Sequence, residues 1–303
     1  ENPMTARAFV NQIWAEFFGK GIVATTGDFG MQGNLPTHPE LLDWLAVDFM
    51  ENNWDIKRLI KKIVLSATYR QSSRISAKHS NTDPENTYLS RFPRVREKAE
   101  FIRDIVLGSS GLLVKTIGGP SVKPYQPKGI WEAATSGRGV LAVYEQDHGE
   151  ALYRRGLYTF IKLTAPPPGM IMFDASNRDQ CEVRRLNTTT PLQALAMMND
   201  PLVLEASRVF AQQLFVKNNS IEQKIQLAFR SIICRTPTSK QLNILSDYYQ
   251  EQFNQFNSKK LDAVKTLHVG EYAQDERVNK NELAALMKVI VTIYNMEEAI
   301  TKT

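Results

Sequence analysis

The chain has 303 residues, of which 43% are hydrophobic, and a formal net charge of +5. This composition provides enough apolar side chains for a sizeable core and excludes an intrinsically disordered protein. The sequence has no run of five or six like charges, no apolar stretch near the roughly 18 residues of a membrane span, and no visible signal peptide. We therefore expect no nucleic-acid partner and no membrane span.

Amphipathic helices are predicted through the first part of the chain. Apolar spacing predicts a helix over 5–18, a second that Thr37 caps, and a third that Asp55 caps. The loop over 24–38 contains three glycines, but their spacing does not fit a phosphate-binding loop and no lysine follows them. We interpret it as an ordered loop without a nucleotide.

A fourth helix is predicted over 97–113. Glu100 and Asp104 lie four residues apart and share one face of it. Carboxylates at this spacing serve acid–base chemistry or a metal, or else they bind nearby arginines. Both interpretations stay open at the level of sequence.

Helical periodicity is lost in the middle of the chain and returns afterwards. Between 118 and 168, glycine, proline and aromatic residues dominate. Alternation over 156–163 predicts a short strand, with 140–144 as its partner. The fold class that follows is mostly α: one multi-helical domain over 1–303 with a small Gly/Pro-rich β or irregular insert near 118–168.

The densest polar stretch precedes two predicted helices late in the chain. A charged loop begins at Asp174, and Asn187 then opens a threonine-capped helix start with Pro191 in its first turn. Asp200 is expected to cap the next helix. This loop is interpreted either as the rim of a polar site or as a buried salt-bridge cluster that joins core elements.

Several arginines near this loop are candidates for binding an anionic group such as sulfate or a uronate carboxylate. The candidates are Arg154, Arg155, Arg178, Arg184 and Arg185. A guanidinium group suits this role because its N–H groups form a planar fork. The alternative is ion pairing with nearby acidic residues of the same loop.

Acid–base candidates are spread over the chain. They are Asp28, His38, Glu100, Asp174 and Asp179. His38 is the best candidate base or ligand, although a neutral histidine at a helix entry is equally consistent with its position. The sequence contains no paired-histidine zinc motif and no nucleophilic serine elbow, so we expect no metal site.

Tryptophan and cysteine leave further alternatives open. Trp131 lies in the glycine-rich insert and is the tryptophan that we expect to be exposed as a sugar platform, whereas Trp14 and Trp44 are assigned to core faces. Cys181 and Cys234 form a disulfide in an oxidising compartment, or else they are two separate buried thiols.

An ordered set of sequence runs resembles a known family. The runs include NPMTARAFVNQIW, GDFGMQGNLPTHPELLDWLA, LSATYRQSS, GGPSVKPYQPKGIWE, RRGLYTF, FDASNRDQCEVRRLNTTTPLQALAMMNDP and IYNMEEAI. Together they resemble the C-terminal domain of unknown function 1553 (PSD-type domain) of planctomycete-type cytochrome c proteins. The resemblance extends from Asn2 to about Ile300 and covers nearly the whole chain.

The resemblance implies an exported bacterial module in the periplasm or at the cell surface. It also implies upstream domains outside these residues, often with a cytochrome c-like domain that carries haem c, whereas this chain itself is expected to hold no cofactor. Genes of this type often lie beside genes for sulfatase-like proteins, which suggests polysaccharide breakdown. The family pattern has asparagine where this chain has Thr189, so Asn187 and Asn199 are the candidate amides that remain.

Three functional hypotheses follow. The preferred one is an accessory or binding module that docks on a partner domain, a haem domain or an anionic glycan. The alternative is an enzyme that acts on anionic or sulfated polysaccharide through the acid–base candidates and the arginines. The third is a redox partner of an attached haem domain, which needs only a docking face near Cys181 or the tryptophans.

Overall fold

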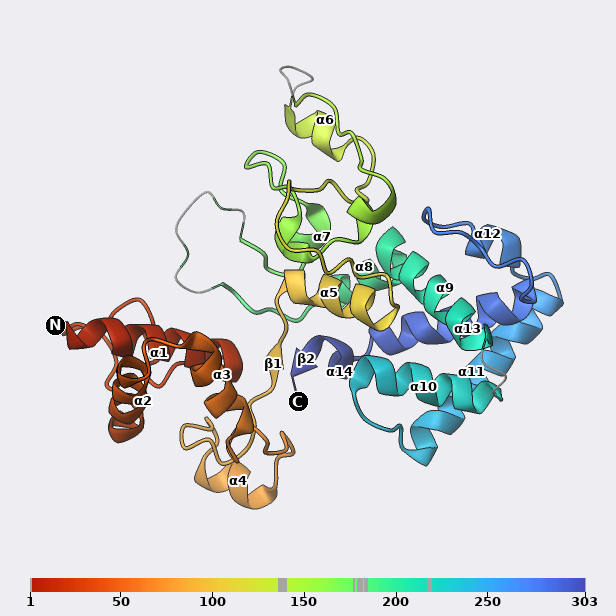
Figure 1. The fold of residues 1–303 in the computed structure, drawn as a ribbon. Coiled ribbons are helices and arrows are strands. Elements are labelled where there is room, and N and C mark those ends of the chain that lie inside the picture. The colour runs from red at the N-terminus through yellow and green to blue at the C-terminus, as the bar shows by residue number, and fades with distance from the viewer. Residues whose placement is uncertain are drawn as a thin grey trace. The chain divides into compact units, whose positions relative to one another are not determined.

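The computed structural model describes residues 2–135, 141–176, 178, 182, 185–216 and 220–302. The fold is mostly α-helical, as the sequence predicts, and one two-stranded sheet is present among the described residues (Figure 1). Contacts divide the chain into two compact units, formed by 1–96 with 301–303 and by 97–300. The single domain that we expected over 1–303 stays a prediction, and the two units are described in turn.

The N-terminal unit combines short helices with the two-stranded sheet. Its elements are α1 (Pro3–Phe18), α2 (Pro39–Glu51), α3 (Ile56–Leu65), α4 (Ala77–Thr82), β1 (Val95–Arg96) and β2 (Thr301–Lys302). Asn2 caps α1 by accepting a hydrogen bond from the Met4 N–H. Gly19 ends α1 with φ of 73°, and Val95 of β1 leaves no room there for a β-carbon.

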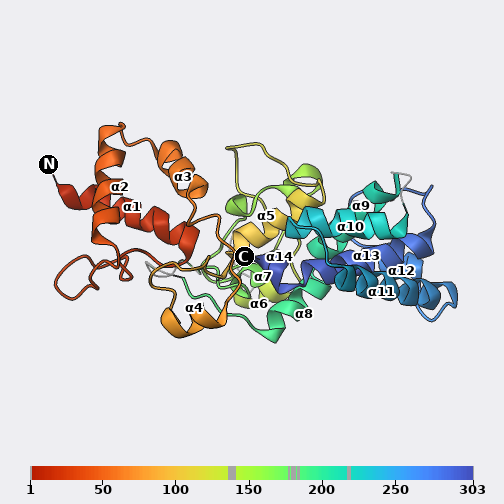
Figure 2. The same cartoon turned by 90° about the horizontal axis from the view of Figure 1, so that it is seen from below.

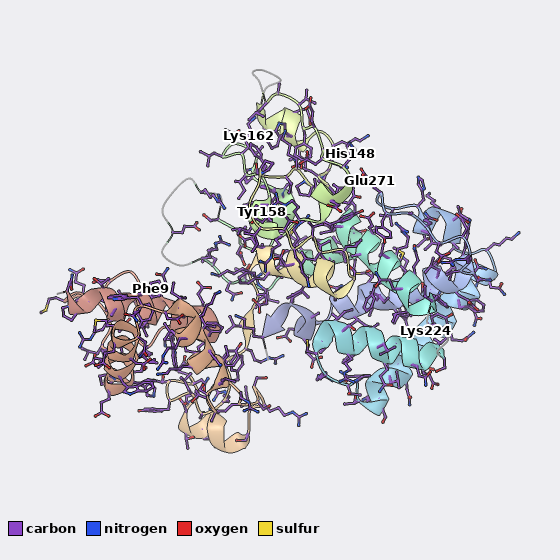
Figure 3. All side chains as sticks on the ribbon, viewed as in Figure 1. Phe9, His148, Tyr158, Lys162, Lys224 and Glu271 are labelled. Atoms are coloured by element: carbon purple, nitrogen blue, oxygen red, sulfur yellow. The ribbon has the colours of Figure 1, made fainter. Side chains whose placement is uncertain are left out.

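Aromatic rings fill the core of this unit. Phe9 of α1 (Figure 3) stacks on Phe49 of α2 with ring centroids 5.2 Å apart. On the same helix, Trp14 stacks on Phe18 at 4.3 Å, and Tyr69 meets Phe18 edge-on. The Phe9–Phe49 pair joins α1 to α2, and the Phe18–Tyr69 pair joins the end of α1 to the segment after α3, through apolar burial and ring geometry.

The end of α2 explains an exposed tryptophan. Asn53 takes a left-handed conformation, with φ of 56°, and the Trp54 N–H bonds to the Phe49 carbonyl at 3.0 Å. Phe49 and Trp54 also make an edge-on ring contact at 5.1 Å. This is a Schellman termination with its usual hydrophobic contact, so Trp54 has a structural role. Asp55 then caps α3 by accepting from the Arg58 N–H, as predicted.

The C-terminal unit packs its helices around a buried central helix. Its longer elements are α5 (Ala99–Ser109), α8 (Pro191–Asn199), α9 (Pro201–Val216), α10 (Ile221–Ile233), α11 (Ser239–Asn257) and α13 (Lys280–Tyr294). Its shorter helices are α6 (Ile130–Thr135), α7 (Pro168–Ile171), α12 (Ala263–Leu267) and α14 (Glu297–Ile300). α13 contacts α9, α10 and α11, and almost every side chain on it from Leu283 to Tyr294 is buried (Figures 1 and 2).

The glycine- and proline-rich insert is irregular, and one expectation about it is wrong. The strand predicted over 156–163 begins instead as a 3-10 turn, Gly156–Tyr158. Thr159 makes a single parallel bridge to Val122, and the partner segment 141–144 forms no strand. Gly156 packs against the backbone of α5, which leaves no space for strand pairing at this point.

Candidate functional site

The candidate site of the C-terminal unit is centred on the first turns of α5. Glu100 accepts two hydrogen bonds from the Arg185 guanidinium, at 2.9 and 2.8 Å. Burial raises the pKa of Glu100, but the hydrogen bonds and charge of Arg185 outweigh this effect, and the resulting pKa is below its ordinary value. The pair ties the segment before α8 to α5.

One turn further along α5, Asp104 binds the insert. Its carboxylate accepts from the Gly156 N–H at 2.7 Å and from Arg155 Nε at 3.3 Å. A β-carbon on Gly156 would lie 2.7 Å from the backbone of Glu100, so only glycine fits. Glu100 and Asp104 thus act as partners of arginines, which is one of the two alternatives that the sequence left open.

Arg154 is also held by contacts inside the protein. Its guanidinium donates to the carbonyls of Pro120, at 2.8 Å, and Gly118. It stacks 3.8 Å from the centroid of the Tyr158 ring, whose hydroxyl accepts from the Gly118 N–H (Figure 3). Arg154 therefore fixes the fold of the insert.

Asp174 anchors the turn that precedes α8. Its carboxylate accepts from the N–H of Thr188, at 2.8 Å, and from the hydroxyl of Thr188. Thr190 and Gln193 then form a capping box at the start of α8, with Pro191 in the first turn, as predicted. Asn187 makes an interaction of its own and is not a free amide.

The remaining candidates of this loop are differently placed. Arg178 is exposed, and Asp179 and Arg184 lie outside the described residues. The exposure expected for Trp131 is wrong: its side chain is 1% exposed, and its indole N–H donates to the Leu141 carbonyl at 2.8 Å. The ring is buried because Tyr144 and Phe160 pack against it, with Lys162 above its face (Figure 3).

The other tryptophan and cysteine expectations also need correction. Trp14 is buried, as expected, but Trp44 is 56% exposed because it lies on the outer side of α2. Cys234 ends α10 in a left-handed conformation and is exposed, so the expectation of a buried thiol is wrong there. Cys181 lies outside the described residues, and the disulfide alternative stays a prediction.

Asp28 and His38 belong to the N-terminal unit. The Asp28 carboxylate accepts from the Gly30 N–H at 2.8 Å and closes a turn of its own loop. The helix expected to be capped by Thr37 begins one residue later, with His38 at the cap position. The Thr37 hydroxyl instead lies 2.9 Å from Nδ1 of His38 and 3.3 Å from the Ile22 carbonyl.

A fully buried carboxylate in the C-terminal unit was not expected from the sequence. Glu205 of α9 is fully buried and accepts hydrogen bonds from the hydroxyls of Tyr125 and Tyr153, each at 3.0 Å, and from the Tyr272 N–H at 2.7 Å. Arg208, also fully buried, lies 3.9 Å away and donates to the Tyr272 carbonyl at 2.6 Å. One sequence signal could have revealed this buried pair. Two opposite charges lie three residues apart on a helix with too few polar residues to form a solvated face.

This buried cluster continues to the surface. The Tyr125 hydroxyl accepts from the Glu271 N–H, and the Glu271 carboxylate lies 2.6 Å from Nδ1 of His148 (Figure 3). Burial raises the pKa of Glu271, but His148 and the Gly149 N–H bring it below its ordinary value. The insert is thereby attached to the loop between α12 and α13.

Asp200 is a second acidic residue that was not among the acid–base candidates selected from the sequence. It caps α9 by accepting from the Leu202 N–H at 2.8 Å, as predicted. Burial raises the pKa of its carboxyl above the ordinary value, although the Leu202 N–H and the charge of Arg103 oppose this shift.

Two further observations describe what the chain can hold. Among the described residues, no three His, Cys, Asp or Glu side chains gather closely enough to bind a metal ion. In the same part of the chain, no helix combines the length and the apolar character that crossing a bilayer requires.

Comparison with known proteins identifies the family. Residues 1–249 match the model of the PSD1 family, which is described as "Protein of unknown function (DUF1553)". The matched range ends within α11 and does not include α13. No curated protein and no solved structure matches the chain. Because the family model covers well over half of the sequence, the chain belongs to this family of proteins of unknown function.

Proposed function

We propose that the chain is a non-catalytic binding module, with a docking face on α8. The observation that carries this proposal is a row of exposed apolar residues on that helix. Leu192, Leu195 and Met198 follow at intervals of three, and each is more than half exposed. We call these three residues the α8 ridge. An apolar row that stays in solvent marks an interaction surface.

Polar residues of the C-terminal unit support a scaffold role. Glu100, Asp104 and Asp174 each use their carboxylate oxygens to hold a neighbouring segment. Gln193 donates to the carbonyls of Met172 and Thr188 and so fixes the end of α7 and the preceding turn against α8. These contacts give the α8 ridge a rigid support, which lowers the entropy lost on docking.

The partner that fits the α8 ridge is a protein surface. Its members are aliphatic side chains and a methionine, and α8 has no charged residue. Sugars are usually held by aromatic faces, and anionic glycans by cations, so this ridge is better suited to apolar side chains of a protein. Following the family resemblance, we assign the partner role to another domain of an exported multidomain protein, of which a haem domain is one kind.

Thiol labelling tests this proposal. In a background with both cysteines replaced by serine, Leu195→Cys is compared in the 303-residue chain and in the full-length natural protein. We expect rapid labelling in the former and at least tenfold slower labelling in the latter, because the partner covers the ridge. Leu157→Cys, on an exposed residue of the insert, serves as the control and should label equally in both. Equal labelling of Leu195→Cys in both proteins refutes the proposal.

One observation favours the enzyme alternative. A carboxyl with a raised pKa, such as that of Asp200 beside Arg103, suits a general acid acting on anionic or sulfated polysaccharide. Asp200→Asn retains an oxygen for the α9 cap and removes the acid. The binding-module proposal expects no new reducing ends from such a polysaccharide with either protein. Release of reducing ends that Asp200→Asn abolishes would favour the enzyme.

A further inference from the structure

The outer side of α2 carries a stripe that is apolar in the middle and acidic at both ends. Glu40, Trp44, Val47 and Glu51 follow at spacings of four, three and four residues and therefore share one side of the helix. All four side chains are exposed. Nothing in the core requires a tryptophan at this position, because its side chain is 56% exposed.

The neighbouring helix α3 carries the opposite charge. Lys57, Lys61 and Leu65 follow at spacings of four residues, and all three are exposed. The opposite side of this helix is apolar and buries Leu59 and Ile63. Between residues 56 and 82 the sequence has seven lysines and arginines and no acidic residue. The positive charge of this segment is not balanced within it.

The helices α2 and α3 contact each other. Asp48 of α2 forms ion pairs with Lys62 and with Arg58, the latter at 3.6 Å. Lys62 Nζ also lies 4.8 Å from the centroid of the Trp44 ring. The acidic stripe and the basic stripe thus lie side by side, separated by ion pairs that are already satisfied.

The charge pattern indicates which partner fits. A polyanion is repelled by Glu40 and Glu51, and a polycation is repelled by Lys57 and Lys61. The matching partner needs a basic stripe opposite α2 and an acidic stripe opposite α3. This surface itself meets that requirement when a two-fold axis places α2 of one copy against α3 of the other.

We propose that the N-terminal unit docks on a second copy of this chain through its α2 and α3 stripes. An antiparallel setting places Glu51 against Lys57 of the partner copy and Trp44 against its Leu65. These spacings agree, because seven residues along α2 and eight along α3 correspond to about 10 and 12 Å at 1.5 Å per residue. The contact is distinct from the α8 ridge, and its failure would leave the binding-module proposal intact.

Charge reversal tests the proposal on the 303-residue chain. Sedimentation equilibrium should show a dimer that dissociates on dilution, and whose dissociation constant rises in about 1 M salt, where charges are screened beyond about 3 Å. Lys57→Glu with Lys61→Glu should raise that constant at least tenfold, and so should Glu40→Lys with Glu51→Lys. The two-fold axis repeats each ion pair, so every substitution removes its ion pair twice. Each exposed ion pair changes the dissociation constant by up to about fivefold.

Mixing the two purified double variants gives the decisive result. An equimolar mixture of the two double variants should form a heterodimer, because each then opposes an acidic stripe to a basic one. The chain carrying all four substitutions should dimerise within about threefold of the wild type, since its α2 stripe is then basic and its α3 stripe acidic, and the two stripes again have opposite charge. Trp44→Ser should weaken the dimer while the circular dichroism spectrum stays unchanged.

A matched control places the same charge change elsewhere. Lys240→Glu with Lys260→Glu reverses two exposed lysines of the C-terminal unit and should leave the dimer unchanged. The proposal is overturned by a wild-type chain that is monomeric at about 100 μM. It is also overturned by dimers that persist in both double variants, or by a mixture of the two that stays monomeric.

Discussion

Replacing the buried Glu205 should cause one of the largest losses of stability that a single substitution can produce in the C-terminal unit. The Glu205→Ala change removes the acceptor for two tyrosine hydroxyls and one backbone N–H. It also leaves the fully buried Arg208 without its nearby negative charge. Each buried donor left unsatisfied costs about 1–3 kcal/mol, and removing one partner of a buried ion pair costs about 3–5 kcal/mol.

These contributions overlap, because one carboxylate provides all of them. We therefore expect a total loss of about 4–5 kcal/mol in the free energy of unfolding. For a unit of roughly 200 residues, this corresponds to a fall of about 8–20 °C in Tm at 2–4 °C per kcal/mol. Trp131, the one tryptophan in the sequence of this unit, allows unfolding to be followed by fluorescence.

Urea unfolding of wild type and Glu205→Ala provides the measurement. Glu222→Ala on the exposed side of α10 is the control, with an expected change within about 0.5 kcal/mol. Glu205→Leu combined with Arg208→Met should recover part of the loss, because both charges are then absent. A loss below about 1.5 kcal/mol for Glu205→Ala would refute the inference that this carboxylate organises the unit.

Three further outcomes are expected. Arg185→Ala should destabilise the protein by about 1 kcal/mol at pH 7. Because the folded pKa of Glu100 is lowered, this contribution is present above about pH 4.5 and is lost as the pH falls through the folded pKa, so an effect in urea titrations that does not shrink as the pH is lowered would contradict it. Gly270→Ala should lower the Tm more than Gly149→Ala does, because both glycines have positive φ but only Gly270 lacks space for a β-carbon. Thermal melts in which Gly149→Ala lowers the Tm more would exclude this reason. Arg154→Lys should lower the free energy of unfolding by about 1–2 kcal/mol, because an ammonium group cannot bind two carbonyls and stack on a ring as the guanidinium does. An unchanged Tm in the same melts would show that the stacking is dispensable.

The helical part of the fold was accessible from sequence because its signals are local. Caps such as Asp55 and Asp200 and the apolar spacing of the helices were identified correctly. The strand expected over 156–163 was wrong, because Gly156 packs against the backbone of α5 and the chain forms a 3-10 turn there instead. Division into two compact units was not expected, since the pairing of β1 with β2 joins residues separated by about 200 positions and leaves no local pattern.

The candidate site was harder to predict from the sequence, because the partners of charged side chains are set by tertiary structure. The sequence left the arginines either to bind an anion or to pair with acidic residues of the loop, whereas Arg185 binds Glu100 and Arg155 contacts Asp104, both on α5. The exposure of Trp131 was misjudged because a glycine-rich context favours a loop, and the rings that cover it come from distant positions. Glu205 was missed because its helix has an apolar stripe in which one carboxylate adds little to the pattern.

The pairing of β1 with β2 has a consequence for protein engineering. Because Val95 and Arg96 lie opposite Lys302 and Thr301, and the Glu97 N–H bonds to the Ile300 carbonyl, the polypeptide leaves the first unit and returns to it at neighbouring points. The second unit is therefore arranged as an insertion into the first. Excising 97–300 and splicing the flanks with a short glycine linker should give a small autonomous protein, and the excised piece, with its two ends side by side, is suited to circular permutation.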